Sequence, residues 1–79
     1  MKVTVRYFAS LRAARGCDVE TIETDCATAR ELYGELEARG RLGHCVDALS
    51  VCINRTMCTM DSSVHNGDEV VYIPPVAGG

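Results

Sequence analysis

The sequence has no apolar run long enough to span a bilayer. It also lacks the charged start and apolar block of a signal peptide, because its first residues, MKVTVRYF, alternate in polarity. These two absences predict a cytoplasmic protein with no membrane partner. With 79 residues and 47% hydrophobic composition, the chain can form one small domain whose core is only marginally sufficient.

An excess of positive charge is missing as well. Eight Lys and Arg residues are outnumbered by eleven Asp and Glu residues, which gives a net charge of −3. The basic residues are scattered, and only Arg39 and Arg41 lie close together. Because nucleic-acid binding needs positive charge to offset the phosphates, we expect no nucleic-acid partner and no RNA-binding module. A docking partner with a basic surface suits the chain better.

The cysteines lack the spacing of a metal or redox site. No CxxC pair occurs, and the C-x4-C-x2-C spacing of plant-type ferredoxins is absent. An odd number of cysteines without an export signal argues against a disulfide framework. We therefore predict no metal and no bound cofactor, and expect most cysteines to be small, partly buried apolar residues. The five are Cys17, Cys26, Cys45, Cys52 and Cys58.

The first third of the chain predicts two strands joined by a short helix. Residues 2–8 alternate in polarity, which is typical of a half-buried strand. A helix over residues 11–15 is expected between Ser10, as its N-cap, and Gly16, as its left-handed stop. Residues 18–24 have an ambiguous alternation that favours an edge strand.

A capping box predicts the main helix. The Thr28 hydroxyl can accept from the amide of Glu31, whose carboxylate can reach back to the start of the helix. The apolar stripe that follows predicts a helix over residues 29–39, ended by Gly40. Gly34 lies in mid-helix, where it costs about 1 kcal/mol relative to alanine. It either permits close packing or is simply tolerated.

Three more strands are expected in the second half, over residues 49–53, 57–60 and 69–73. Turns at 54–55 and 66–67 separate them. The resulting order is β-β-α-β-β-β. If the first and last strands pair at the centre of a mixed sheet with one helix packed on it, the fold is α+β, the ubiquitin-like β-grasp.

The last residues, IPPVAGG, predict a tail that leaves a folded domain. We place the domain at residues 1–75 and a flexible tail at 76–79, because Pro74-Pro75 fixes φ and offers no amide donors. Extended, the tail spans at most about 14 Å. Its glycines can enter a channel too narrow for other residues. The tail consists of Val76, Ala77, Gly78 and Gly79, and the Gly79 carboxylate can attack an ATP phosphorus and then react as an acyl adenylate.

Four segments carry a resemblance to a known family: FASLRAARG, INRT, NGDEV and, most specifically, IPPVAGG. With them the chain resembles the MoaD-type sulfur carriers, the small subunits of molybdopterin synthase, over its whole length. It departs from the family at Ala13, where an acidic residue is common, and in its many cysteines. Both departures bear on the subfamily more than on the mechanism.

The resemblance implies a carrier that is not itself an enzyme. An adenylyltransferase resembling ubiquitin-activating enzymes would adenylate Gly79 with ATP and magnesium, and a persulfide donor would convert it to a thiocarboxylate. The carrier would then insert its tail into the large catalytic subunit of molybdopterin synthase, where the sulfur builds the dithiolene of molybdopterin. For partner docking we expect an exposed apolar surface of Phe8, Met57, Val71 and Ile73.

Several alternatives stay open at this point. The same fold and GlyGly end serve sulfur carriers for thiamin or another thiolated product, and ubiquitin-like modifiers conjugated through Gly79. Cys45 or Cys58 could relay sulfur to Gly79 as a persulfide, whereas Cys52 lies in an apolar strand and is not expected to do so. His44 precedes Cys45, but adjacency in sequence does not make a nucleophile and its base.

Overall fold

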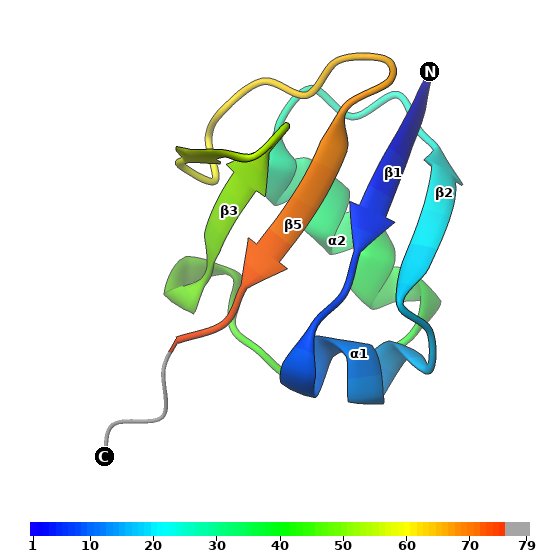
Figure 1. Cartoon of the computed structure of the whole chain (residues 1–79), viewed down its shortest axis with the longest axis vertical. Helices are drawn as coiled ribbons and strands as arrows, with labels where there is room; N and C mark the ends of the chain where they lie inside the picture. The colour runs from blue at the N-terminus through cyan, green and yellow to red at the C-terminus, as the bar shows by residue number, and fades with distance from the viewer. Residues whose placement is uncertain (76–79) are drawn as a thin grey trace.

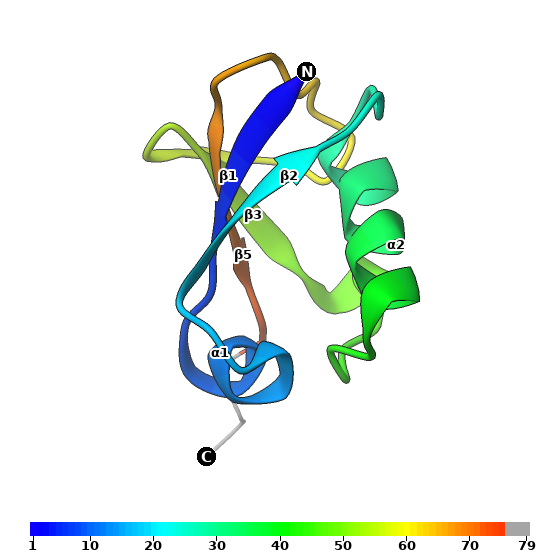
Figure 2. The same cartoon turned by 90° about the vertical axis from the view of Figure 1, so that its right-hand side faces the viewer.

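The computed structural model describes residues 1–75, so the predicted tail, residues 76–79, lies outside the described part. A mixed five-stranded sheet in the order β2-β1-β5-β3-β4 is covered on one face by α2 (Figures 1 and 2). No helix in the described residues is long and apolar enough to cross a membrane. The elements are β1 (Lys2–Arg6), α1 (Ala9–Arg15), β2 (Val19–Glu23), α2 (Ala29–Arg39), the 3-10 helix η1 (Val46–Ala48), β3 (Ser50–Ile53), β4 (Thr56–Cys58) and β5 (Glu69–Ile73).

The first and last strands pair in parallel at the centre of the sheet, as the sequence predicts. Val5 lies opposite Val70, and both side chains are fully buried. The other pairings are antiparallel: β2 with β1, β3 with β5, and β4 with β3. β2 lies at one edge of the sheet, as predicted. Of its residues only Ile22 is fully buried in the core, and Val19 is exposed.

The core between the sheet and α2 contains three tyrosines, of which two meet at the centre. The rings of Tyr33 on α2 and Tyr72 on β5 pack edge to face with their centroids 5.1 Å apart. The Tyr72 hydroxyl donates to the Ala29 carbonyl at 2.6 Å, which ties β5 to the first turn of α2. Burial raises the pKa of Tyr72 well above its usual value, so it remains a neutral donor.

The capping box at α2 forms with one difference from the prediction. The Thr28 hydroxyl accepts from the amide of Glu31 at 3.2 Å, as expected. The Glu31 carboxylate, however, accepts from the amide of Ala27 at 2.7 Å, one residue before the N-cap. The helix ends at Gly40, whose φ of 168° is extended backbone rather than a left-handed stop. A Cβ on Gly34 would meet no atom within 4 Å, so this glycine is not needed for close packing.

The predicted start of α1 is wrong by two residues. The helix begins at Ala9, its N-cap is Phe8 without a side-chain hydrogen bond, and Ser10 lies inside the helix instead of capping it. The cause is Ala9, which adopts a φ of 49° and turns the chain into the helix earlier than the polar pattern suggests. Gly16 ends the helix in the left-handed region with a φ of 84°, as predicted.

β4 is shorter than predicted and ends at Cys58 rather than at residue 60. The chain turns away because the amide of Ser62 donates to the Thr59 carbonyl at 3.0 Å, and the Met60 carbonyl accepts from the amide of Arg30 at 2.8 Å. Met60 thereby satisfies a free amide at the start of α2 instead of continuing the ladder, and its side chain is buried in the core.

The turn between β3 and β4 gives a test of local strain. Asn54 and Arg55 have φ values of 53° and 70°, the left-handed pair of a type I′ hairpin turn. Arginine is unfavourable there by about 1–2 kcal/mol, which exceeds the extra entropy that glycine loses on folding. We expect Arg55→Gly to raise the free energy of unfolding by up to about 1 kcal/mol in urea denaturation at unchanged m.

The matched control is Gly67→Ala. Gly67 has a φ of 88° in the turn before β5, so alanine there introduces the strain that Arg55→Gly removes. It should lower the free energy of unfolding. A loss of stability in Arg55→Gly would mean that the arginine side chain stabilises the fold by more than its backbone strains it.

Candidate functional site

The four residues predicted for docking lie on the face of the sheet that α2 leaves uncovered. Phe8 is 55% exposed, Met57 61% and Ile73 36%, whereas Val71 is half-buried. Alternation along the strands produces this arrangement, because the neighbours Tyr7, Val70 and Tyr72 point into the core. We call the set Phe8, Met57, Val71 and Ile73 the docking face, after the role predicted for it from the sequence.

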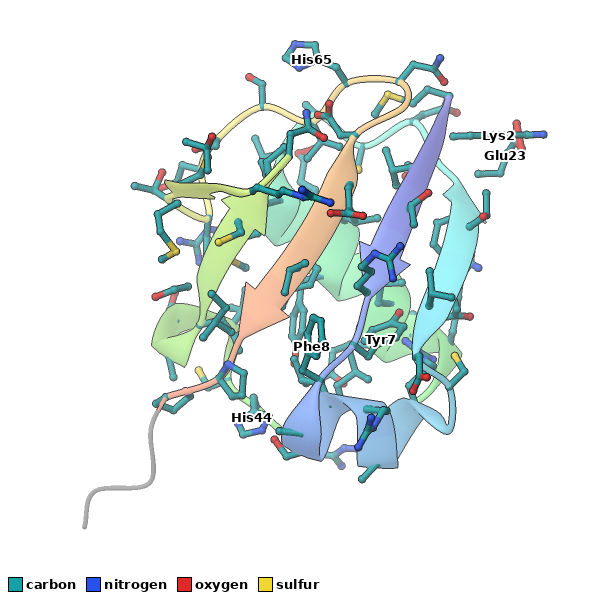
Figure 3. All side chains as sticks on the ribbon, viewed as in Figure 1. Lys2, Tyr7, Phe8, Glu23, His44 and His65 are labelled. Atoms are coloured by element: carbon teal, nitrogen blue, oxygen red, sulfur yellow. The ribbon has the colours of Figure 1, made fainter. Side chains whose placement is uncertain are left out.

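The sheet register places the members of the docking face close together. Cys52 of β3 lies opposite Val71 of β5 on one side and opposite Met57 of β4 on the other. Arg6 pairs with Val71, so Phe8, two residues further along, lies between the ends of β1 and β5 (Figure 3). The face therefore extends from the end of β1 across β5 and β3 to β4, and on its β5 side it ends where β5 ends.

Sequence reasoning missed one member of this surface. The apolar strand around Cys52 predicts no exposed thiol there, whereas Cys52 is half-buried on the uncovered face, and its thiol lies 3.0 Å from the Met57 sulfur. The signal was present in SVCI, because Val51 and Ile53 are buried and the residue between them must point the other way. With Cys52 included from here on, the docking face contains two sulfur-bearing, polarisable side chains, those of Cys52 and Met57.

Charged residues border the docking face on its β1 side. The Arg6 guanidinium lies 2.7 Å from the Glu69 carboxylate on the next strand, with both side chains partly exposed. Val19 on β2 pairs with Arg6 and is 45% exposed, so the apolar character continues beyond this ion pair. The surface therefore combines an apolar centre with a polar border, which is the usual composition of a protein interface.

The predicted tail residues lie outside the described part of the chain, but the structure describes the two prolines that precede them. Pro74, half-buried, and Pro75, exposed, follow directly after Ile73. Because proline donates no amide hydrogen bond, the β5 ladder cannot continue through them. The described chain therefore leaves the sheet beside Ile73, at the border of the docking face.

The cysteines are free thiols with different surroundings. Cys17, Cys26 and Cys58 pack against the core, as expected of small apolar residues. Burial raises the pKa of Cys26, and the Cys58 thiol donates to the Thr56 carbonyl at 3.2 Å. Cys45 departs from this pattern, because it is exposed.

Cys45 lies in an open groove between α2 and η1, with a volume of about 290 Å³. The groove is lined by Arg30, Tyr33, Gly34, Glu37, His44, Cys45 and Val46. The His44 ring lies 2.8 Å from the Ser10 hydroxyl, so its Nε2 is occupied by a partner on α1. In residues 1–75 no three His, Cys, Asp or Glu side chains are arranged to hold a metal ion.

Comparisons with known proteins agree over nearly the whole chain. The model of the ThiS family matches residues 5–79. A molybdopterin synthase sulfur carrier subunit of Haemophilus influenzae is 38% identical, with the alignment covering 98% of this chain and 99% of that protein. The structure of a molybdopterin converting factor subunit 1 from Pyrococcus furiosus has a TM-score of 0.78 at 31% identity, covering 96% of this chain and 99% of that one.

The chain belongs to the ThiS family. The β-grasp fold and the resemblance to MoaD-type sulfur carriers, both predicted from the sequence, are confirmed. The fold is also found in the complex of subunits 1 and 2 of the molybdopterin-converting factor from Helicobacter pylori, with a TM-score of 0.67 at 22% identity and full coverage of both chains.

If the docking face is not part of the core, polar substitutions there should hardly affect stability. We expect Phe8→Ser and Met57→Ser to shift the melting temperature by less than about 3 °C, because both side chains are more than half exposed. Tyr72→Phe should lower it by at least about 4 °C, since the Ala29 carbonyl loses its buried donor. Differential scanning calorimetry measures all three, and a large loss in Met57→Ser would assign that residue to the core.

Proposed function

We propose that this protein is the sulfur carrier subunit of a molybdopterin synthase and that Gly79 carries the sulfur as a C-terminal thiocarboxylate. The observation that carries the proposal is the match, over nearly the full length of both chains, to a sulfur carrier subunit of that enzyme. The sequence given ends with a core strand, two prolines and, after two more residues, GlyGly. This arrangement suits the proposed chemistry, because it places the glycines beyond the folded domain.

The chemistry takes place at the chain end, and the catalytic side chains belong to the partners. An adenylyltransferase of the ubiquitin-activating type transfers AMP from ATP, with magnesium, to the Gly79 carboxylate and releases pyrophosphate. The terminal sulfur of a persulfide donor then displaces AMP and forms an acyl disulfide. A second thiol attacks the donor's sulfur in that disulfide, so that the S–S bond breaks, the thiocarboxylate leaves, and the thiol and the donor are joined as a disulfide. The carrier works in the cytoplasm and binds no cofactor of its own.

The folded domain positions the reactive end. Docking converts an encounter between a sulfur donor and its substrate into an effectively unimolecular step, because the partner holds a whole domain at a fixed place. Pro74 and Pro75 limit the directions in which the chain leaves β5. Gly78 and Gly79, without Cβ atoms, let the end enter a narrow channel in the partner.

The large catalytic subunit of molybdopterin synthase is the partner that receives the sulfur. A complex between the two subunits is known for the Helicobacter pylori protein, which shares the fold. The docking face supports such a complex, because an exposed apolar surface beside the base of the tail brings the partner close to the reactive end. The net charge of −3 favours a partner that has a basic surface around its binding site.

Carriers for thiamin or another thiolated product, and protein modifiers, use the same terminal chemistry. The names of the full-length relatives favour molybdopterin synthase over these alternatives.

The first test of the proposal is the identity of the chain end. Protein purified from its native host should contain a species in which one oxygen is exchanged for sulfur, and tandem mass spectrometry should locate the exchange in the C-terminal peptide. Deleting Gly79, or adding one alanine after it, should abolish sulfur transfer without changing the melting temperature, because the core lies within residues 1–75. Sulfur transfer by the Gly79 deletion would refute the proposal.

The second test concerns docking. Phe8→Asp, Met57→Asp and Ile73→Asp should each weaken the complex with the large subunit by about 10- to 100-fold in calorimetric titration, because each places a charge in an apolar interface. Ala38→Asp on the exposed side of α2 is the matched control, since it adds the same charge on the opposite face of the molecule. If the three docking-face variants bound the large subunit as tightly as Ala38→Asp and the wild type do, the partner would bind elsewhere.

A further inference from the structure

A buried guanidinium connects the two helices to the edge of the sheet. Arg15, the last residue of α1, has a side chain that is only 9% exposed. Its Nη2 donates to the Leu36 carbonyl of α2 at 2.6 Å. Its Nε lies 3.2 Å from the Glu20 carboxylate of β2, although that N–H is not aligned with an acceptor in the described residues. A charge is costly to bury, so this one needs an explanation beyond helix formation.

Tyr7 belongs to the same cluster. The Arg15 guanidinium lies over its ring, with the central carbon 5.6 Å from the ring centroid. The Tyr7 hydroxyl donates to the Glu20 carboxylate at 2.7 Å, the same oxygen that faces Arg15. Glu20 thus holds both ends of the segment from residue 7 to residue 15, and this segment includes the whole of α1.

Phe8 lies at a strained corner between these two anchors. Tyr7 is 1% exposed whereas Phe8 is 55% exposed, so the chain changes from core to surface within one residue. The next residue, Ala9, has a φ of 49°, in the left-handed region. A strained backbone of this kind persists only where its surroundings hold it in place. The Phe8 carbonyl accepts from the amides of Leu11 and Arg12, which couples the corner to α1.

We propose that Arg15 is a positioning residue for the docking face: it holds α1 against β2 and α2 so that the Phe8 side chain lies beside Ile73. Arg15 is not expected to contact a partner, since only 9% of its side chain is exposed. It acts through Tyr7, Glu20 and the helix. The functional part of this inference rests on the proposed docking role, whereas the structural part concerns only the position of Phe8.

The composition of the chain provides a direct probe. Phe8 is the only phenylalanine, so protein grown with 4-fluorophenylalanine gives a single ¹⁹F resonance from that ring. Arg15→Met keeps the length of the side chain and removes its charge and donors. We expect the resonance of this variant to shift or broaden relative to the wild type. A resonance unchanged in position and width, in a folded Arg15→Met protein, would overturn the proposal.

Two further variants separate positioning from general loss of stability. Val64→Ala removes a buried side chain in the loop before β5, at the opposite end of the molecule from α1 (Figure 1), and should leave the resonance unchanged. Gly40→Ala places a Cβ 3.3 Å from Nη1 of Arg15, in an extended backbone that alanine adopts freely. It should shift the resonance in the same direction by a smaller amount, and it provides the test if Arg15→Met does not fold.

Binding completes the experiment with the same proteins. Titration with the large subunit should show about tenfold weaker affinity for Arg15→Met and wild-type affinity for Val64→Ala. If Phe8→Asp weakens binding and Arg15→Met does not, the positioning role is wrong and the docking face stands. If neither weakens binding, the docking proposal is wrong, and the ¹⁹F spectra alone decide whether Arg15 positions Phe8.

Discussion

The parallel pairing of β1 with β5 is the constraint on which the other features depend. It joins segments that are 63 residues apart at the Arg6–Glu69 contact and places Val5 against Val70 in the centre of the core. Two features of the candidate site follow from it. The outward residues of both strands share one surface, and β1 ends next to the end of β5, so that Phe8 is brought close to the last residue of β5, Ile73. If β5 slipped by one residue against β1, its buried side chains would turn to the surface and its outward side chains would turn into the core.

Local chemistry explains which parts of the fold could be predicted. The bounds of α2 and β5 match the prediction because a capping threonine, a regular apolar stripe and a pair of prolines mark them. The start of α1 could not be predicted, since nothing in the residue type of Ala9 indicates a left-handed backbone. The early end of β4 had a similar cause. Met60 is an apolar residue of a kind that strands contain. Only the three-dimensional fold shows that its carbonyl accepts a hydrogen bond from the amide of Arg30 at the start of α2.

The candidate site was partly predictable for a related reason. Alternation in polarity identifies the side of a strand on which a residue lies, so Phe8, Met57, Val71 and Ile73 could be assigned to one face from sequence. The same rule applied to Cys52 and was outweighed by the apolar character of its neighbours. Arg15 could not be found in this way, because an arginine in the last turn of a helix normally points into solvent. The difference is that a face depends on short-range periodicity, whereas a buried charge depends on partners distant in sequence.

The direction in which β1 and β5 run also determines how the domain responds to force. The first residue and the end of β5 lie at opposite ends of the sheet, and the two strands are neighbours (Figure 1). Tension applied between the start of β1 and Pro75 would therefore slide one strand along the other and load their hydrogen bonds together. Pulling on two adjacent ends of an antiparallel hairpin would instead break such bonds one at a time. The parallel pairing of β1 with β5 therefore sets several hydrogen bonds at once against tension along the strands, and fewer against tension across them.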